Sequence, residues 1–152
     1  MPFSISFSLD HRHPDYASGS ISLGSHIDYF RASTSLWKLQ DYETQWREAL
    51  EIVTRDGVPT ALITDLYDPA SASLITWWPM WRDGGEIRIQ NQLLIFEQLP
   101  TPFNPQLPYE HMGEYSGAVT DDGEKTSEWK VPVLDVLAFL RTGHTDATIN
   151  GA

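Results

Sequence analysis

The chain has 152 residues and carries 10 Lys and Arg against 21 Asp and Glu, which gives a formal net charge of −11 at pH 7. This charge counts against a protein that binds nucleic acid or an anionic membrane surface directly, because phosphate contacts need clustered Lys and Arg. Since the sequence contains no Cys, it excludes disulfides, thiolate zinc sites and a Cys nucleophile.

The first part of the chain contains one clear strand pattern and one clear helix pattern. Apolar residues alternate with Ser over residues 3–9, which is typical of a strand with one buried face. The polar residues 10–19 suggest a loop, and a weaker alternation from Ile21 toward Phe30 suggests a second strand. Apolar residues then recur at helical spacing over residues 39–53, and a Gly and a Pro follow, so the pattern predicts a helix that ends there.

The rest of the chain is dominated by strand-like runs, at residues 60–67, 74–81, 87–95 and 129–131. The sequence Asp-Gly-Gly at residues 83–85 predicts a hairpin between the second and third runs. A helix with an apolar stripe from Val133 to Leu140 is expected, with Pro132 in its first turn and Gly143 at its end. These elements predict a single α+β domain over residues 1–143, with a mainly antiparallel sheet of about five to six strands and two main helices. Residues 144–152 are expected to form a flexible tail.

Few residues suggest catalysis or metal binding. Asp65 and Asp68 end a strand-like run, where two carboxylates could act as acid and base, but Asp68 followed by Pro is more simply a turn. His11 and His13 lie in the expected loop without the spacing of a known metal motif. We therefore expect no catalytic residue, no metal site and no cofactor. The alternative is a small cytosolic enzyme or ligand-binding domain that uses Asp65, Asp68 and the nearby Trp residues.

Two groups of residues are candidates for contact with a partner protein. Trp77 and Trp81 share one face of their predicted strand, where they are expected to join the core, so Trp78 would point to the opposite, exposed face. Residues 97–128 hold seven acids and one base, which indicates either a solvated surface or a docking face for a basic partner. The candidate contact residues in this segment are Glu110, Glu114, Asp121, Asp122, Glu124 and Glu128.

Several short motifs accompany the strand-like runs and the C-terminal helix. They are Ala61-Leu62-Ile63-Thr64, Tyr67-Asp68-Pro69, Trp77-Trp78-Pro79-Met80, Gln90-Asn91-Gln92-Leu93-Leu94, Ser127-Glu128-Trp129, Val131-Pro132, Phe139-Leu140 and Thr142-Gly143. This set resembles bacterial immunity proteins of contact-dependent growth inhibition (CdiI-type) and related polymorphic-toxin systems.

The resemblance implies a small α+β protein, without catalytic activity, that binds and neutralises the C-terminal toxin domain of a cognate CdiA-type effector. Many such toxins are nucleases with basic active sites, and carboxylates on an inhibitor can pair with the Lys and Arg of such a site. A cytoplasmic location is expected, because no stretch approaches the ~20 apolar residues of a membrane helix and the first residues lack a signal-peptide pattern.

Overall fold

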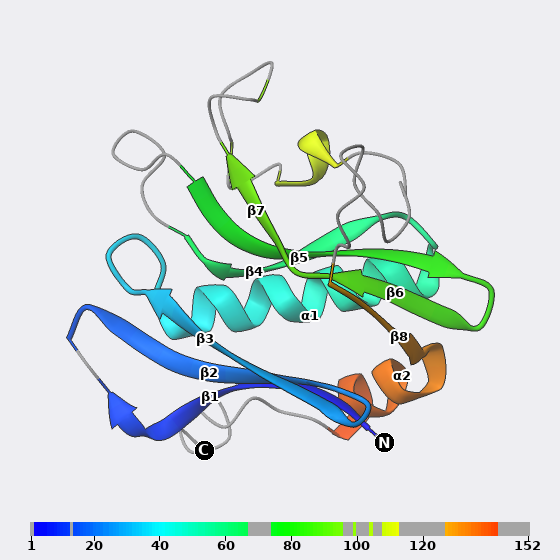
Figure 1. The fold of residues 1–152 in the computed structure, drawn as a ribbon, viewed down its shortest axis with the longest axis horizontal. Coiled ribbons are helices and arrows are strands. Elements are labelled where there is room, and N and C mark those ends of the chain that lie inside the picture. Colours follow the sequence, from blue (N-terminus) through cyan, green and yellow to red (C-terminus); the bar gives the residue numbers. More distant parts are fainter. Residues whose placement is uncertain are drawn as a thin grey trace.

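Two antiparallel sheets lie on opposite sides of helix α1 in the computed structural model of the chain (Figure 1). The structure describes residues 2–12, 14–66, 74–95, 99, 104, 108–112 and 127–142. Within these residues the elements are, in order, β1 (Phe3–Arg12), β2 (Tyr16–Leu23), β3 (His26–Ser33), α1 (Leu39–Arg55), β4 (Thr60–Asp65), β5 (Leu74–Asp83), β6 (Glu86–Gln90), β7 (Gln92–Ile95), the 3-10 helix η2 (Pro108–His111), β8 (Glu128–Pro132) and α2 (Val133–Thr142). The α+β class is confirmed, and the strands divide between sheets of three and five.

β1, β2 and β3 form the smaller sheet, in that order. Its inner face is apolar and lies against α1, where the rings of Phe7 and Phe30 have centroids 4.9 and 5.7 Å from that of Trp46. On β2, buried residues alternate with half-buried Tyr and Ser residues that face outward. The alternation seen at the start of the sequence therefore reports a sheet with one covered face and one open face.

Two expectations for this sheet are wrong. The loop expected over residues 10–19 is largely strand, because β1 continues to Arg12 and β2 begins at Tyr16. The single strand expected from Ile21 toward Phe30 is two strands, joined by a turn in which Gly24 has a φ of 71°. The first half of β2 resembles a loop in composition, because its outward-facing side chains, such as Ser18, are polar.

The larger sheet contains β4, β5, β6 and β8 in that order, and β7 pairs with the other half of β5. The hairpin expected at residues 83–85 is confirmed, with Asp83 paired to Glu86 across the turn. The strand expected over residues 87–95 is divided into β6 and β7. The division falls at Asn91, whose backbone N–H bonds to the carbonyl of Ser127 at 3.2 Å instead.

Both expected helices are present in the described residues. The buried face of α1 includes the stripe read from the sequence, Tyr42, Trp46, Ala49, Leu50 and Val53. α2 packs against β1, where Phe139 contacts Phe3 at 5.5 Å between ring centroids. Within the described part of the chain, no helix is long and apolar enough to cross a membrane. Residues 144–152 lie outside the described residues, so the expected tail stays a prediction.

β4 is an edge strand of the larger sheet, and side chains of α1 cover its free edge. Gln45 uses both ends of its amide: Nε2 donates to the carbonyl of Ala61 at 2.7 Å, and Oε1 accepts the N–H of Ile63 at 2.9 Å. Trp46 Nε1 donates to the carbonyl of Ile63 at 2.7 Å. These backbone groups are thus paired without another strand, which closes the edge to strand addition.

Two further contacts join this edge to the smaller sheet. The hydroxyl of Tyr42 donates to the carbonyl of Ser33, in β3, at 2.7 Å and accepts the N–H of Leu66, just after β4, at 3.0 Å. The carboxylate of Asp65 accepts the N–H of Ser33 at 2.8 Å. The ends of β3 and β4 are therefore held together by one side chain of α1 and one of β4.

Gln45→Leu should lower the free energy of unfolding by about 2–4 kcal/mol, because it leaves a buried N–H and a buried carbonyl of β4 without their partner. Gln40→Leu is the matched control, since Gln40 is an exposed residue of the same helix. Urea unfolding followed by tryptophan fluorescence gives both values. Equal losses in the two variants would contradict the role assigned to Gln45.

Candidate functional site

Of the two carboxylates that suggested acid-base chemistry, the structure describes one, Asp65. Asp65 is engaged by the backbone N–H of Ser33, so it connects β4 to β3. Asp68 and the side chains of His11 and His13 lie outside the described residues. Within the part of the chain that the structure describes, no group of three or more His, Cys, Asp or Glu could hold a metal ion.

The expected exposure of Trp78 is wrong. Its side chain is 1% exposed, and Trp77 and Trp81 are buried as well. The cause is that both faces of β5 are covered, since the consecutive residues 77–80 are all buried. Trp78 contacts Trp129 of β8 at 5.7 Å between ring centroids, and Trp129 in turn stacks on His26 of β3 at 4.6 Å. Trp78 therefore belongs to the core between the sheets and offers no surface to a partner.

Glu128 is the one acidic candidate whose side chain the structure describes. It lies in β8 with its side chain 9% exposed, and its carboxylate pairs with Arg88 at 3.4 Å and accepts a hydrogen bond from Gln90 at 2.9 Å. Its charge is thus matched inside the chain. Glu110 lies in η2 with its side chain outside the described residues. The remaining candidates, Glu114, Asp121, Asp122 and Glu124, lie outside the described residues, so their role stays a prediction.

Glu128→Ala should lower the free energy of unfolding by about 1–3 kcal/mol, because Arg88 and Gln90 lose a charged partner in a poorly solvated place. Arg88 keeps its second ion pair, to Asp83 at 2.8 Å, which limits the loss. Glu86→Ala, at the exposed start of β6, is the control. Thermal unfolding that gave the same stability for both variants would show that Glu128 is an ordinary surface acid.

A groove between α1 and η2 was not predicted from the sequence. It has a volume of about 360 Å³ and is lined by Trp37, Asp41, Thr44, Gln45, Glu48, Pro108 and Tyr109. We call it the α1–η2 groove. Asp41, Thr44 and Glu48 are exposed and recur at helical spacing on the side of α1 that faces away from the core. That spacing was visible in the sequence, but nothing local showed that Tyr109 would meet it.

The electrostatics of the α1–η2 groove favour a cation. Burial raises the pKa of Tyr109 to about 12, the hydrogen bond from Gln45 opposes this rise, and the nearby charge of Glu48 adds to it. The phenol therefore stays neutral at physiological pH, and the groove takes its charge from Asp41 and Glu48. Aromatic rings and carboxylates together form the usual surroundings of a Lys or Arg side chain.

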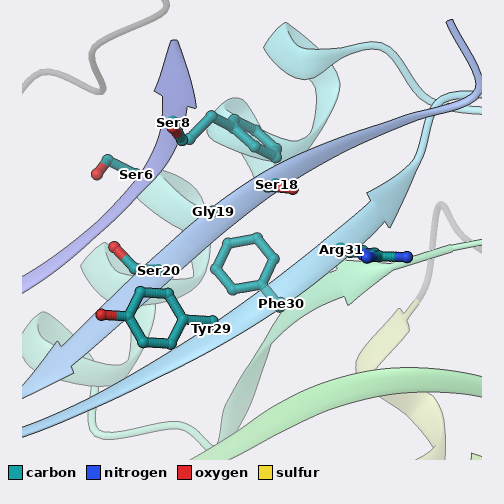
Figure 2. Close-up of a pocket in the computed structure, with 9 residues that line it drawn as sticks. Ser6, Ser8, Ser18, Gly19, Ser20, Tyr29, Phe30 and Arg31 are labelled. Carbon is teal, nitrogen blue, oxygen red and sulfur yellow. The ribbon is translucent and has the colours of Figure 1, made fainter. Parts of the chain in front are cut away.

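The open face of the smaller sheet is a second candidate surface (Figure 2). A hollow of about 640 Å³ lies there, and its outward-facing residues are Ser6, Ser8, Ser18, Ser20, Tyr29 and Arg31. We call these six residues the serine face. Tyr29 is 74% exposed, and the guanidinium of Arg31 lies 4.8 Å from the ring centroid of Tyr16. The serine face therefore offers hydroxyl groups, one aromatic ring and one positive charge.

Three comparisons relate the chain to known proteins. Residues 32–139 match the family model described as the CdiI N-terminal domain. The chain is similar to the immunity protein CdiI of Enterobacter cloacae subsp. cloacae, with 25% identity over 125 residues, which are 81% of this chain and 83% of that protein. Its structure is similar to a chain of the solved CdiA-CT/CdiI toxin and immunity complex from Enterobacter cloacae, with a TM-score of 0.79 at 21% identity over 99% of both chains. This last match shows a shared fold.

Proposed function

The chain belongs to the CdiI N-terminal domain family, and we propose that it is an immunity protein that binds and neutralises the C-terminal toxin domain of a CdiA-type protein. The observation that carries this proposal is the family match over residues 32–139, which spans α1, the larger sheet and most of α2. The similarity to a curated protein named immunity protein CdiI supports the same function. The shared fold with a chain of a solved toxin and immunity complex is consistent with it.

In this proposal, the protein acts by binding the toxin domain and not by catalysis. The enzyme alternative depended on Asp65, Asp68 and nearby Trp residues. Asp65 is hydrogen bonded to the backbone of Ser33, and Trp77 and Trp78 are in the core, so these three are used to hold the fold. A binding role is supported instead by two surfaces, the serine face and the acidic α1–η2 groove.

The proposed toxin is basic and nuclease-like. Two observations support this choice: the net charge of −11, and the two carboxylates on the exposed side of α1. An acidic inhibitor attracts a basic phosphate-binding site at long range and pairs with its Lys and Arg at contact. The other candidate acids, which are Glu110 of η2 and the later residues Glu114, Asp121, Asp122 and Glu124, would add to this negative charge.

Co-expression of this chain should restore growth to cells that produce the C-terminal domain of the CdiA-type protein encoded with it. The two purified proteins should elute as a complex in size-exclusion chromatography, because neutralisation by binding requires a stable complex. A toxin domain from an unrelated CdiA-type protein is the control and should remain toxic. Absence of both protection and a complex with the cognate domain would refute the proposed function.

A nuclease assay on the same purified pair tests the finer claim. The toxin domain alone should cleave DNA or RNA, and a stoichiometric amount of this chain should stop the cleavage. A toxin that is neutralised but has no nuclease activity would leave the immunity function intact and contradict the nuclease assignment.

A further inference from the structure

We propose that the α1–η2 groove is the place where the chain receives Lys or Arg side chains of the toxin domain. The inference rests on the proposed function and adds the part of the surface that carries recognition. Its basis is the combination, in one groove of about 360 Å³, of fixed aromatic walls and carboxylates on an exposed helix face.

The walls of the α1–η2 groove are held in place before any partner binds. Trp37 packs edge-on against the buried ring of Tyr42, with centroids 5.2 Å apart and an interplanar angle of 81°. Tyr109 is fixed from the other side, since Gln45 Nε2 donates to its hydroxyl at 2.8 Å. Side chains that are already ordered lose little entropy on binding, which favours affinity. The aliphatic part of a Lys or Arg can lie along these rings while its charged end stays at the carboxylates.

The carboxylates of the groove differ from those of Asp83 and Glu128. Asp83 and Glu128 are both paired with Arg88. No ion pair within the described residues includes Asp41 or Glu48, and the one hydrogen bond of Asp41 comes from the backbone N–H of Lys38 at 2.8 Å. Two helical turns separate Asp41 from Glu48, which is about 10 Å along the axis of α1. The groove therefore presents two negative charges that suit two cationic side chains at a similar distance.

The serine face does not fit the same partner. Its charged residue is Arg31, which repels a basic surface and suits an acidic or uncharged one. Like charges placed opposite each other across an interface oppose association. For a basic toxin domain, charge complementarity thus selects the α1–η2 groove.

Glu48→Lys tests the inference with the purified toxin domain of the CdiA-type protein encoded with this chain as the binding partner. The dissociation constant should rise by about tenfold or more, mainly through faster dissociation, because the variant puts a like charge against a bound cation. Glu86→Lys is the matched control: it changes the net charge by the same amount at the exposed start of β6 in the larger sheet. This control should slow association slightly and leave dissociation unchanged. Circular dichroism and thermal unfolding establish that both variants are folded.

The remaining outcomes separate the two proposals. If the unmodified chain binds the toxin domain and Glu48→Lys binds no worse than Glu86→Lys, the groove inference is wrong and the immunity function stands. Loss of binding in Tyr29→Ala, together with full binding in Glu48→Lys, would place the interface on the serine face. If the unmodified chain itself does not bind, it is the proposed function that fails.

Discussion

The contact between α1 and the free edge of β4 determines how this molecule is assembled. An edge strand has a row of backbone N–H and carbonyl groups that another strand would normally pair, or that water would solvate. Here Gln45 and Trp46 pair these groups with side chains of a helix. The helix can then occupy the space between the two sheets and cover the apolar face of each (Figure 1). Each unpaired group in this buried place would otherwise cost about 1–3 kcal/mol.

The same helix positions the surface to which we assign recognition. Gln45 bonds β4 with its amide and also donates to Tyr109, so the residue that closes the edge also fixes one wall of the α1–η2 groove. Asp41 and Glu48 lie one turn before and one turn after Gln45 on α1, and both are exposed. Neighbouring side chains of one helix thus contribute to stability and to the surface to which we assign recognition. The hydrogen bonds to β4 come from Gln45 and Trp46, so the charges of Asp41 and Glu48 can change without removing these bonds.

The sequence predicted correctly those elements whose pattern depends on residues close together in the chain. The apolar stripe of α1 and the turn at residues 83–85 each depend on neighbours a few positions apart, and both expectations are confirmed. The expectation for Trp78 is wrong, because its burial depends on Trp129, which is 51 positions away in the sequence. The α1–η2 groove was missed for the same reason, since Gln45 and Tyr109 are 64 positions apart. The acids Glu114, Asp121, Asp122 and Glu124 remain known from the sequence alone.

Native-state hydrogen exchange of the backbone N–H groups of Ile63 and Leu66 tests the central claim most directly. These two groups are bonded to the side chains of Gln45 and Tyr42 and not to another strand. If α1 seals the edge of β4, both should exchange only through global unfolding, with the same free energy of opening as the most protected amides of β5. Exchange of Ile63 and Leu66 at the rate of an exposed edge strand, while β5 stays protected, would contradict the account.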